Sequence, residues 1–217
     1  MKFKAFIFDL DGTLVNSEQD ITDSINFSLS SQNFDTLTVE EARKKIGNGI
    51  NKLVIDALPQ KYKNNNKVIA RTLELMAQKY SQSWKKNTCL YPKIANLLDQ
   101  LMINKIPMAI LSNKPDPFVQ EIVKFLISKW EFVTIMGART SLPLKPNPQS
   151  TLEIIKKLNI NAHDIAFVGD GDTDIKTALG AGIHPIAVTW GLRSVEELTQ
   201  VGAKTFINNP LELLEYI

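Results

Sequence analysis

The sequence has one cysteine, Cys89, only two histidines, and no long run of apolar residues. A single cysteine excludes an intrachain disulfide, so the chain is not a disulfide scaffold built for an oxidising compartment. Apolar residues follow the basic first four positions, but Asp9 and Asp11 interrupt them too early for a signal sequence. No stretch approaches the length of a membrane span. We therefore expect a cytoplasmic protein with no membrane partner.

The sequence also lacks a strong excess of charge of either sign. It has 25 Lys and Arg against 23 Asp and Glu, a formal net charge of +2, and its basic residues are scattered. This distribution gives no support to nucleic-acid binding. Apolar residues make up 44% and charged residues 22%, which is ordinary for a globular protein. At ~150 residues per domain, 217 residues suggest one domain with a sizeable insertion.

Two regions of the chain carry different periodic patterns. Between about residues 16 and 86 the pattern is helical throughout, beginning with Ile21, Ile25 and Leu29 at i+4 spacing. From Tyr91 onward, helices alternate with short apolar strands, which predicts a parallel sheet. In the first region we expect helices from Thr38, at 50–58 and at 68–84, with a loop at 61–67. In the second we expect helices at 94–103, 118–126, 148–158, 173–181, 195–200 and 211–216, and strands at 108–111, 132–136, 165–168, 186–188 and 205–207.

The first predicted strand, Phe6 to Phe8, stops on two carboxylates, Asp9 and Asp11, before the turn residue Gly12. In an extended chain these carboxylates point the same way, toward the crevice expected at the carboxyl end of an open α/β sheet. Two close carboxylates repel unless a cation lies between them, so a divalent metal is one hypothesis. The alternative is that both residues only cap a turn.

Three later stretches repeat this arrangement of polar residues after an apolar strand. Ser112 and Asn113 follow the strand at 108–111, where they could cap a helix or bind an anion. Lys145 precedes a proline, which restricts its backbone, although most lysines are simply solvated. The third stretch brings Asp170 and Asp174, with Asp172 between them. Three carboxylates exceed what helix capping requires, and a metal would explain the excess.

Two other known motifs, the EF-hand loop and the dinucleotide-binding fingerprint, do not match the spacing of these residues. Neither acidic stretch is an EF-hand loop, because Leu14 and Ile175 stand where glycine is needed. The Gly169-Asp170-Gly171 segment is not a dinucleotide fingerprint, since Asp174 replaces its last glycine. The remaining inventory is a carboxylate nucleophile, a second carboxylate, a cation site and donors for phosphoryl oxygens. This inventory suits metal-assisted phosphoryl transfer.

The four stretches in this order resemble the motifs of the haloacid dehalogenase superfamily of phosphatases. The resemblance implies an α/β fold with a Rossmann-like three-layer core and a parallel sheet, formed by residues 1–15 and 87–217. It also implies a small, inserted, all-helical cap domain at residues 16–86. Residues 47–49, 112–115 with Phe118-Val119, and 189–191 more narrowly resemble bacterial phosphoglycolate phosphatases.

The resemblance implies a role for each matching residue. Asp9 would be the nucleophile that forms an aspartyl-phosphate, and Asp11 would protonate the leaving alkoxide and then activate water. Ser112 and Lys145 would hold phosphoryl oxygens, assisted by Asn113. Mg²⁺ would be held by the Asp9 side chain, the Asp11 backbone carbonyl, Asp170 and Asp174. Asp172 has no assigned role.

The resemblance leaves the substrate open. 2-Phosphoglycolate is the leading candidate, and its carboxylate would need a cation or amides from the cap. Pyrophosphate, a sugar phosphate or a nucleotide are alternatives, and so, less favoured, is a phospho-accepting or binding module that does not turn over. A dehalogenase is disfavoured because Asp11 supplies the proton-transfer group. We expect a small phosphorylated metabolite as the partner and a monomer or weak homodimer. The candidate carboxylate-binding residues are Arg43, Lys44, Lys45, Lys52 and the backbone around Asn48.

Overall fold

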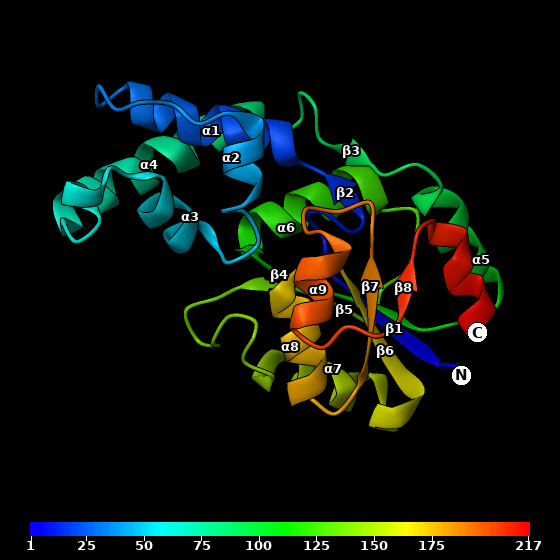
Figure 1. Ribbon diagram of the computed structural model, residues 1–217. Helices are drawn as coiled ribbons and strands as arrows, with labels where there is room; N and C mark the ends of the chain where they lie inside the picture. The colour runs from blue at the N-terminus through cyan, green and yellow to red at the C-terminus, as the bar shows by residue number, and fades with distance from the viewer.

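A computed structural model describes residues 1–217 and is built on a six-stranded parallel sheet (Figure 1). The strand order is β5-β4-β1-β6-β7-β8, so the chain leaves β1 in one direction and later returns to its other side. Such a reversal opens a crevice at the carboxyl ends of the two central strands. Residues after β1 therefore lie at the expected ligand position. The strands are β1 Ala5–Phe8, β4 Met108–Pro115, β5 Thr134–Ala138, β6 Ile165–Gly169, β7 His184–Val188 and β8 Phe206–Ile207.

Helices cover both faces of this sheet, because successive strand residues alternate between the faces. Phe6 and Phe8 of β1 pack with α5, α6 and the terminal 3₁₀ helix η4, whereas Ala5 and Ile7 pack with α7 and α8. Leu198 of α9 packs on α8 and β7. The predicted α/β fold with a three-layer Rossmann-like core is confirmed. The helices are α5 Ile94–Ile103, α6 Asp116–Ile122, α7 Gln149–Leu158, α8 Asp172–Gly180, α9 Val195–Gln200 and η4 Pro210–Tyr216, with short turns η2 Val123–Ile127 and η3 Ala162–Asp164.

Four further α-helices lie together beside the sheet, at the upper left of Figure 1. We call residues 16–86 the helical module. Its core forms where Ile21, Ile25 and Leu29 of α1 meet Met76 and Tyr80 of α4, all of them buried. The division of the chain into two domains at these boundaries stays a prediction. The elements are α1 Glu18–Ser30, α2 Val39–Arg43, α3 Ile50–Ala57, the 3₁₀ turn η1 Gln60–Tyr62 and α4 Asn66–Ser83.

A small antiparallel ribbon joins the two connections of the helical module to the rest of the chain. Strand β2, Val15–Asn16, pairs with β3, Cys89–Leu90. The sequence analysis did not anticipate this ribbon, because two residues per strand are too few to show an alternating pattern. The pairing fixes the entry and exit of the module close to one another.

Most other predicted elements occur within a few residues of their expected bounds. Three differ more: the segment predicted as a helix at 118–126 changes from α to π geometry after Ile122, the tail at 211–216 is a 3₁₀ helix, and strand β4 continues to Pro115, four residues past its predicted end. The capping box predicted at Thr38 is present. None of the helices is both long and apolar enough to cross a bilayer.

Candidate active site

Asp9 lies directly after β1, at the point where the strand order reverses. Its carboxylate is buried, and both of its close contacts are made to one oxygen, Oδ1. The Leu10 backbone N–H donates to Oδ1 over 2.7 Å, and Lys145 Nζ lies 2.9 Å from it. The second oxygen, Oδ2, is left without these partners. A charged oxygen held beside a crevice in this way is suited to act as a ligand or a nucleophile.

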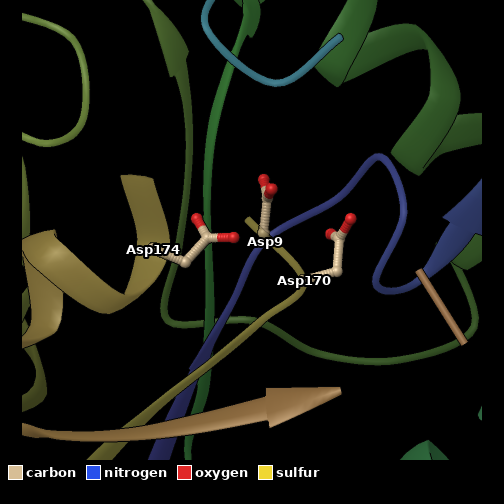
Figure 2. A group of neighbouring side chains, drawn as sticks. All are labelled: Asp9, Asp170 and Asp174. Atoms are coloured by element: carbon tan, nitrogen blue, oxygen red, sulfur yellow. The ribbon is translucent and has the colours of Figure 1, made fainter. Parts of the chain in front are cut away.

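Asp9 forms a cluster with two other buried carboxylates, Asp170 after β6 and Asp174 in α8. One oxygen of each lies within 4.8 Å of the others, and Asp9 stands between the other two (Figure 2). Burial and the charge of Asp174 raise the pKa of Asp9 to about 7, while burial and the charge of Asp9 raise the pKa of Asp170 to about 6. The cluster therefore carries more negative charge than its surroundings neutralise. Oxygen-only donors with uncompensated charge are what Mg²⁺ requires, so the residues fit this ion.

Asp170 is held in place by its neighbours on both sides. Its Oδ1 accepts a hydrogen bond from Thr13 Oγ1 and its Oδ2 accepts one from the Leu192 backbone N–H, both at 2.8 Å. Gly12 and Gly191 press so closely on the Asp170 side chain that a Cβ atom on either would overlap with it. The backbone approach that these glycines allow therefore fixes the carboxylate direction.

Lys145 is the cation of this cluster. Its Nζ lies 2.6 Å from Asp174 Oδ1, and it also donates to the Leu111 carbonyl oxygen over 3.0 Å. Burial disfavours the charged lysine, but Asp174 and Asp9 outweigh burial and raise the pKa of Lys145 above its usual range. Lys145 is thus permanently charged, and one positive charge faces three carboxylates.

The Asp11 side chain is not part of this cluster, and a cation held between the Asp9 and Asp11 side chains stays a prediction. β1 ends at Phe8 and the chain bends at Leu10, so the two carboxylates do not share an extended strand. The Asp11 carboxylate instead accepts hydrogen bonds from Lys114 Nζ, over 2.9 and 3.1 Å, and from the Ser17 hydroxyl. Asp9 and Asp11 nevertheless line the same cavity.

Ser112 and Asn113 belong to the last residues of β4 and are buried. The Asn113 side chain receives a hydrogen bond from the Lys145 backbone N–H at 2.8 Å and donates to the Lys145 and Gly47 carbonyl oxygens. It therefore joins the Lys145 loop to the helical module. Ser112 Oγ accepts a hydrogen bond from the Lys114 N–H over 3.2 Å, and the hydroxyl also lines the cavity next to Asp9.

The structure separates other candidates from the site. The cavity beside Asp9 and Asp11 is lined by none of the four basic residues that the sequence suggested as carboxylate-binding groups, Arg43, Lys44, Lys45 and Lys52. Asp172 pairs with Lys176 one turn along α8.

Two residues without an assigned role at the sequence level do line the cavity, Lys114 and Tyr80. Lys114 was within reach of sequence reasoning, because it follows Ser112 and Asn113 directly. Tyr80 reads only as a core residue of a helix, and nothing in its local pattern indicates a site.

The sequence and the fold are similar to those of known hydrolases. The family model of haloacid dehalogenase-like hydrolases matches residues 6–188. A phosphoglycolate phosphatase of Yersinia pestis is 33% identical over 195 residues, covering 88% of this chain and 84% of the relative. A phosphoglycolate phosphatase of Vibrio parahaemolyticus is 30% identical over 219 residues, which cover 99% of this chain and 96% of the relative. The crystal structure of a predicted phosphoglycolate phosphatase from Haemophilus somnus superposes with a TM-score of 0.91 at 26% identity, covering 99% of this chain and 98% of the other.

Proposed function

The chain belongs to the haloacid dehalogenase-like hydrolase family and is a phosphoric monoester hydrolase, and we propose that it is a Mg²⁺-dependent phosphatase acting on 2-phosphoglycolate. The observation that carries this proposal is the position of the carboxylate cluster. Asp9, Asp170 and Asp174 meet with Lys145 at the carboxyl end of β1, where a sheet of this topology binds ligands.

The proposed reaction has two steps on phosphorus. Asp9 attacks the phosphoryl group, the bond from phosphorus to the ester oxygen breaks, and the departing alkoxide takes a proton from Asp11. Asp11, now a carboxylate, takes a proton from water as the water oxygen attacks the aspartyl-phosphate. The bond between phosphorus and Asp9 then breaks and releases inorganic phosphate. The free Oδ2 of Asp9 and the position of Asp11 on the same cavity support these roles.

The phosphoryl oxygens would be held by Ser112, the backbone at Asn113 and Lys145. The Asn113 side chain already has partners, which favours its backbone N–H for this role. Mg²⁺ would be held by the Asp9 side chain, the Asp11 backbone carbonyl, Asp170 and Asp174, and when bound it would neutralise charge on the phosphoryl group. Asp174 already accepts hydrogen bonds from Lys145 and the Gly171 N–H, which favours support of the ion through water.

The substrate is proposed from the names of the relatives. The relatives cited above are named as phosphoglycolate phosphatases. We propose that the helical module moves away from the core to admit substrate and returns to exclude water.

The test is release of inorganic phosphate from 2-phosphoglycolate, pyrophosphate, sugar phosphates and nucleotides, with and without Mg²⁺. The native chain should release phosphate fastest from 2-phosphoglycolate and only with Mg²⁺, and Asp9→Asn should abolish the release. A faster reaction with another substrate would refute the substrate and leave the mechanism standing. Turnover by Asp9→Asn at the native rate would refute the mechanism.

A further inference from the structure

The cavity beside Asp9 and Asp11 has a largely apolar wall, formed mainly by side chains of the helical module. Its lining comes from α1, α3 and α4 of the module and from α6 of the core, together with Asp9 and Asp11. A charged group that enters such a cavity loses its water shell, so it needs a partner of opposite charge. The apolar residues of the lining are Ile21, Ile46, Ile50, Leu53, Met76, Tyr80 and Phe118, with Pro115 beside them.

Lys114 is the only cationic side chain in this lining. Two exposed lysines of the module have other partners: Lys44 is 70% exposed and pairs with Glu40, and Lys52 is 56% exposed and pairs with Asp56. Arg43 donates to the Gly191 carbonyl oxygen, outside the cavity. An anionic group bound in the cavity therefore has one basic side chain available to it.

The Lys114 ammonium is held in place by Asp11, but not all of its N–H groups donate hydrogen bonds to Asp11. Two of its contacts go to the Asp11 oxygens, and an ammonium carries three N–H donors. The ion pair with Asp11 offsets the cost of burying this charge. Lys114 Nζ also lies 4.6 Å from the centre of the Tyr80 ring. The third N–H lies on the side of Tyr80, whose hydroxyl is close enough to Lys114 to interact with it but does not complete a hydrogen bond.

The Tyr80 hydroxyl is buried without a hydrogen-bond partner. The residue is only 3% exposed and packs edge-on against Phe118, with ring centres 5.0 Å apart. Burial raises the pKa of Tyr80, so the phenol keeps its proton and is available as a donor. A buried hydroxyl without a partner is unfavourable, and an acceptor supplied by a ligand would satisfy it.

We propose that Lys114 and Tyr80 form the subsite that binds the anionic end of the leaving group, which makes the substrate a small phosphate monoester carrying a carboxylate. Lys114 comes from the core and Tyr80 from the helical module, so a carboxylate bound to both also joins the two parts. The apolar walls select against leaving groups with further polar atoms, since these atoms would have no partners. This inference rests on the proposed phosphatase function and adds the residues that choose the substrate.

The test compares two substrates of equal length that differ at the proposed contact. 2-Phosphoglycolate ends in a carboxylate, and 2-hydroxyethyl phosphate ends in an uncharged hydroxyl. Tyr80→Phe removes only an oxygen without a protein partner, so its thermal unfolding should match that of the native chain. It should lower kcat/KM about 10-fold for 2-phosphoglycolate, mainly through KM, with little change for 2-hydroxyethyl phosphate.

Lys114→Met should lower the ratio of the two kcat/KM values by about 100-fold. Loss of the contact to Asp11 slows both substrates equally and cancels in this ratio. Lys52→Met, an exposed lysine of the module, is the matched control and should leave the ratio unchanged.

The results distinguish a failure of the proposed Lys114–Tyr80 subsite from a failure of the proposed phosphatase function. If Lys114→Met and Tyr80→Phe reduce both substrates by the same factor, the residues act on Asp11 or on folding, and the subsite is refuted while the phosphatase function stands. If the native chain releases phosphate from neither substrate with Mg²⁺, the proposed function fails and the subsite falls with it.

Discussion

Lys145 and Asp174 form an ion pair in the interior of the site, with Nζ 2.6 Å from Oδ1 and both side chains 1% exposed. The same ammonium lies 2.9 Å from Asp9 Oδ1. Lys145 therefore links a carboxylate of α8 to the residue that ends β1, and holds two like charges close together. Its removal should affect both the stability of the fold and the chemistry of the site.

Lys145→Met should lower the free energy of unfolding of the metal-free protein by about 3 kcal/mol, because it leaves buried carboxylates without their cation. Urea unfolding at pH 8 measures this loss, which should shrink at pH 5, where the carboxylates bind protons instead. The control is Lys176→Met, which breaks the partly exposed pair with Asp172 and should cost less than about 0.5 kcal/mol. Equal losses in the two variants would contradict the importance of the buried pair.

The stability of the metal-free protein should fall as pH rises from about 4 to 7 through the Asp9 and Asp170 titrations. Their pKa values are raised to about 7 and about 6, so in this window the folded protein holds protons that the unfolded chain has released. Stability decreases with pH wherever the folded state binds more protons. Thermal unfolding in EDTA measures the decrease, and Asp9→Asn should flatten it.

Mg²⁺ should raise the unfolding temperature more at pH 8 than at pH 5, because protons compete with the ion for the same carboxylates. The comparison is made by thermal unfolding in EDTA and in excess Mg²⁺ at both pH values. An equal rise at both would place the ion away from Asp9, Asp170 and Asp174.

Gly191→Ala should raise the Mg²⁺ concentration needed for half-maximal activity at least about 10-fold, as expected when a group that orients a metal ligand is disturbed. The new methyl group would overlap with the Asp170 side chain and lie 2.6 Å from the Gly12 carbonyl oxygen. Gly182→Ala is the control, since a Cβ atom there meets nothing within 4 Å and its φ of +71° makes the cost one of backbone strain alone. That variant should lose stability without losing metal affinity.

Arg193→Met should raise KM for the substrate several-fold and loosen the helical module. The guanidinium comes from the loop after β7 and donates to the Arg43 and Ile46 carbonyl oxygens of the module over 2.9 and 2.6 Å, while Arg43 donates to Gly191 over 2.5 Å. Small-angle scattering should show a larger radius of gyration for the variant. Arg139→Met, which breaks a pair with Asp116 on the core, should alter neither quantity.

The sequence was sufficient to predict the sheet, the helical region and the polar residues after the strands. Strand periodicity and turn residues are local properties, and Asp9, Asp170 and Lys145 each follow or precede such a signal. The convergence of Asp9 and Asp170 follows from the topology, because parallel strands end at the same edge.

Properties that depend on packing between distant segments were not predictable from the sequence. The direction of Asp11 depends on where β1 ends, and the contact of Tyr80 with the site depends on how the helical module lies on the core. The lysines of the module illustrate the same limit: Lys44 and Lys52 resemble binding residues in the sequence, yet they lie on the surface. Lys114, inside a strand, faces the cavity instead.

The most direct test of the central claim is to find where the phosphoryl group is during turnover. Asp11→Asn should accept phosphate from acetyl phosphate, whose leaving group needs no proton, but should release it slowly because no base activates water. After rapid quenching, mass spectrometry should find a phosphoryl group on the peptide that contains Asp9, and Asp9→Asn should show none. Turnover without phosphorylation at Asp9, or phosphorylation at another residue, would contradict the account.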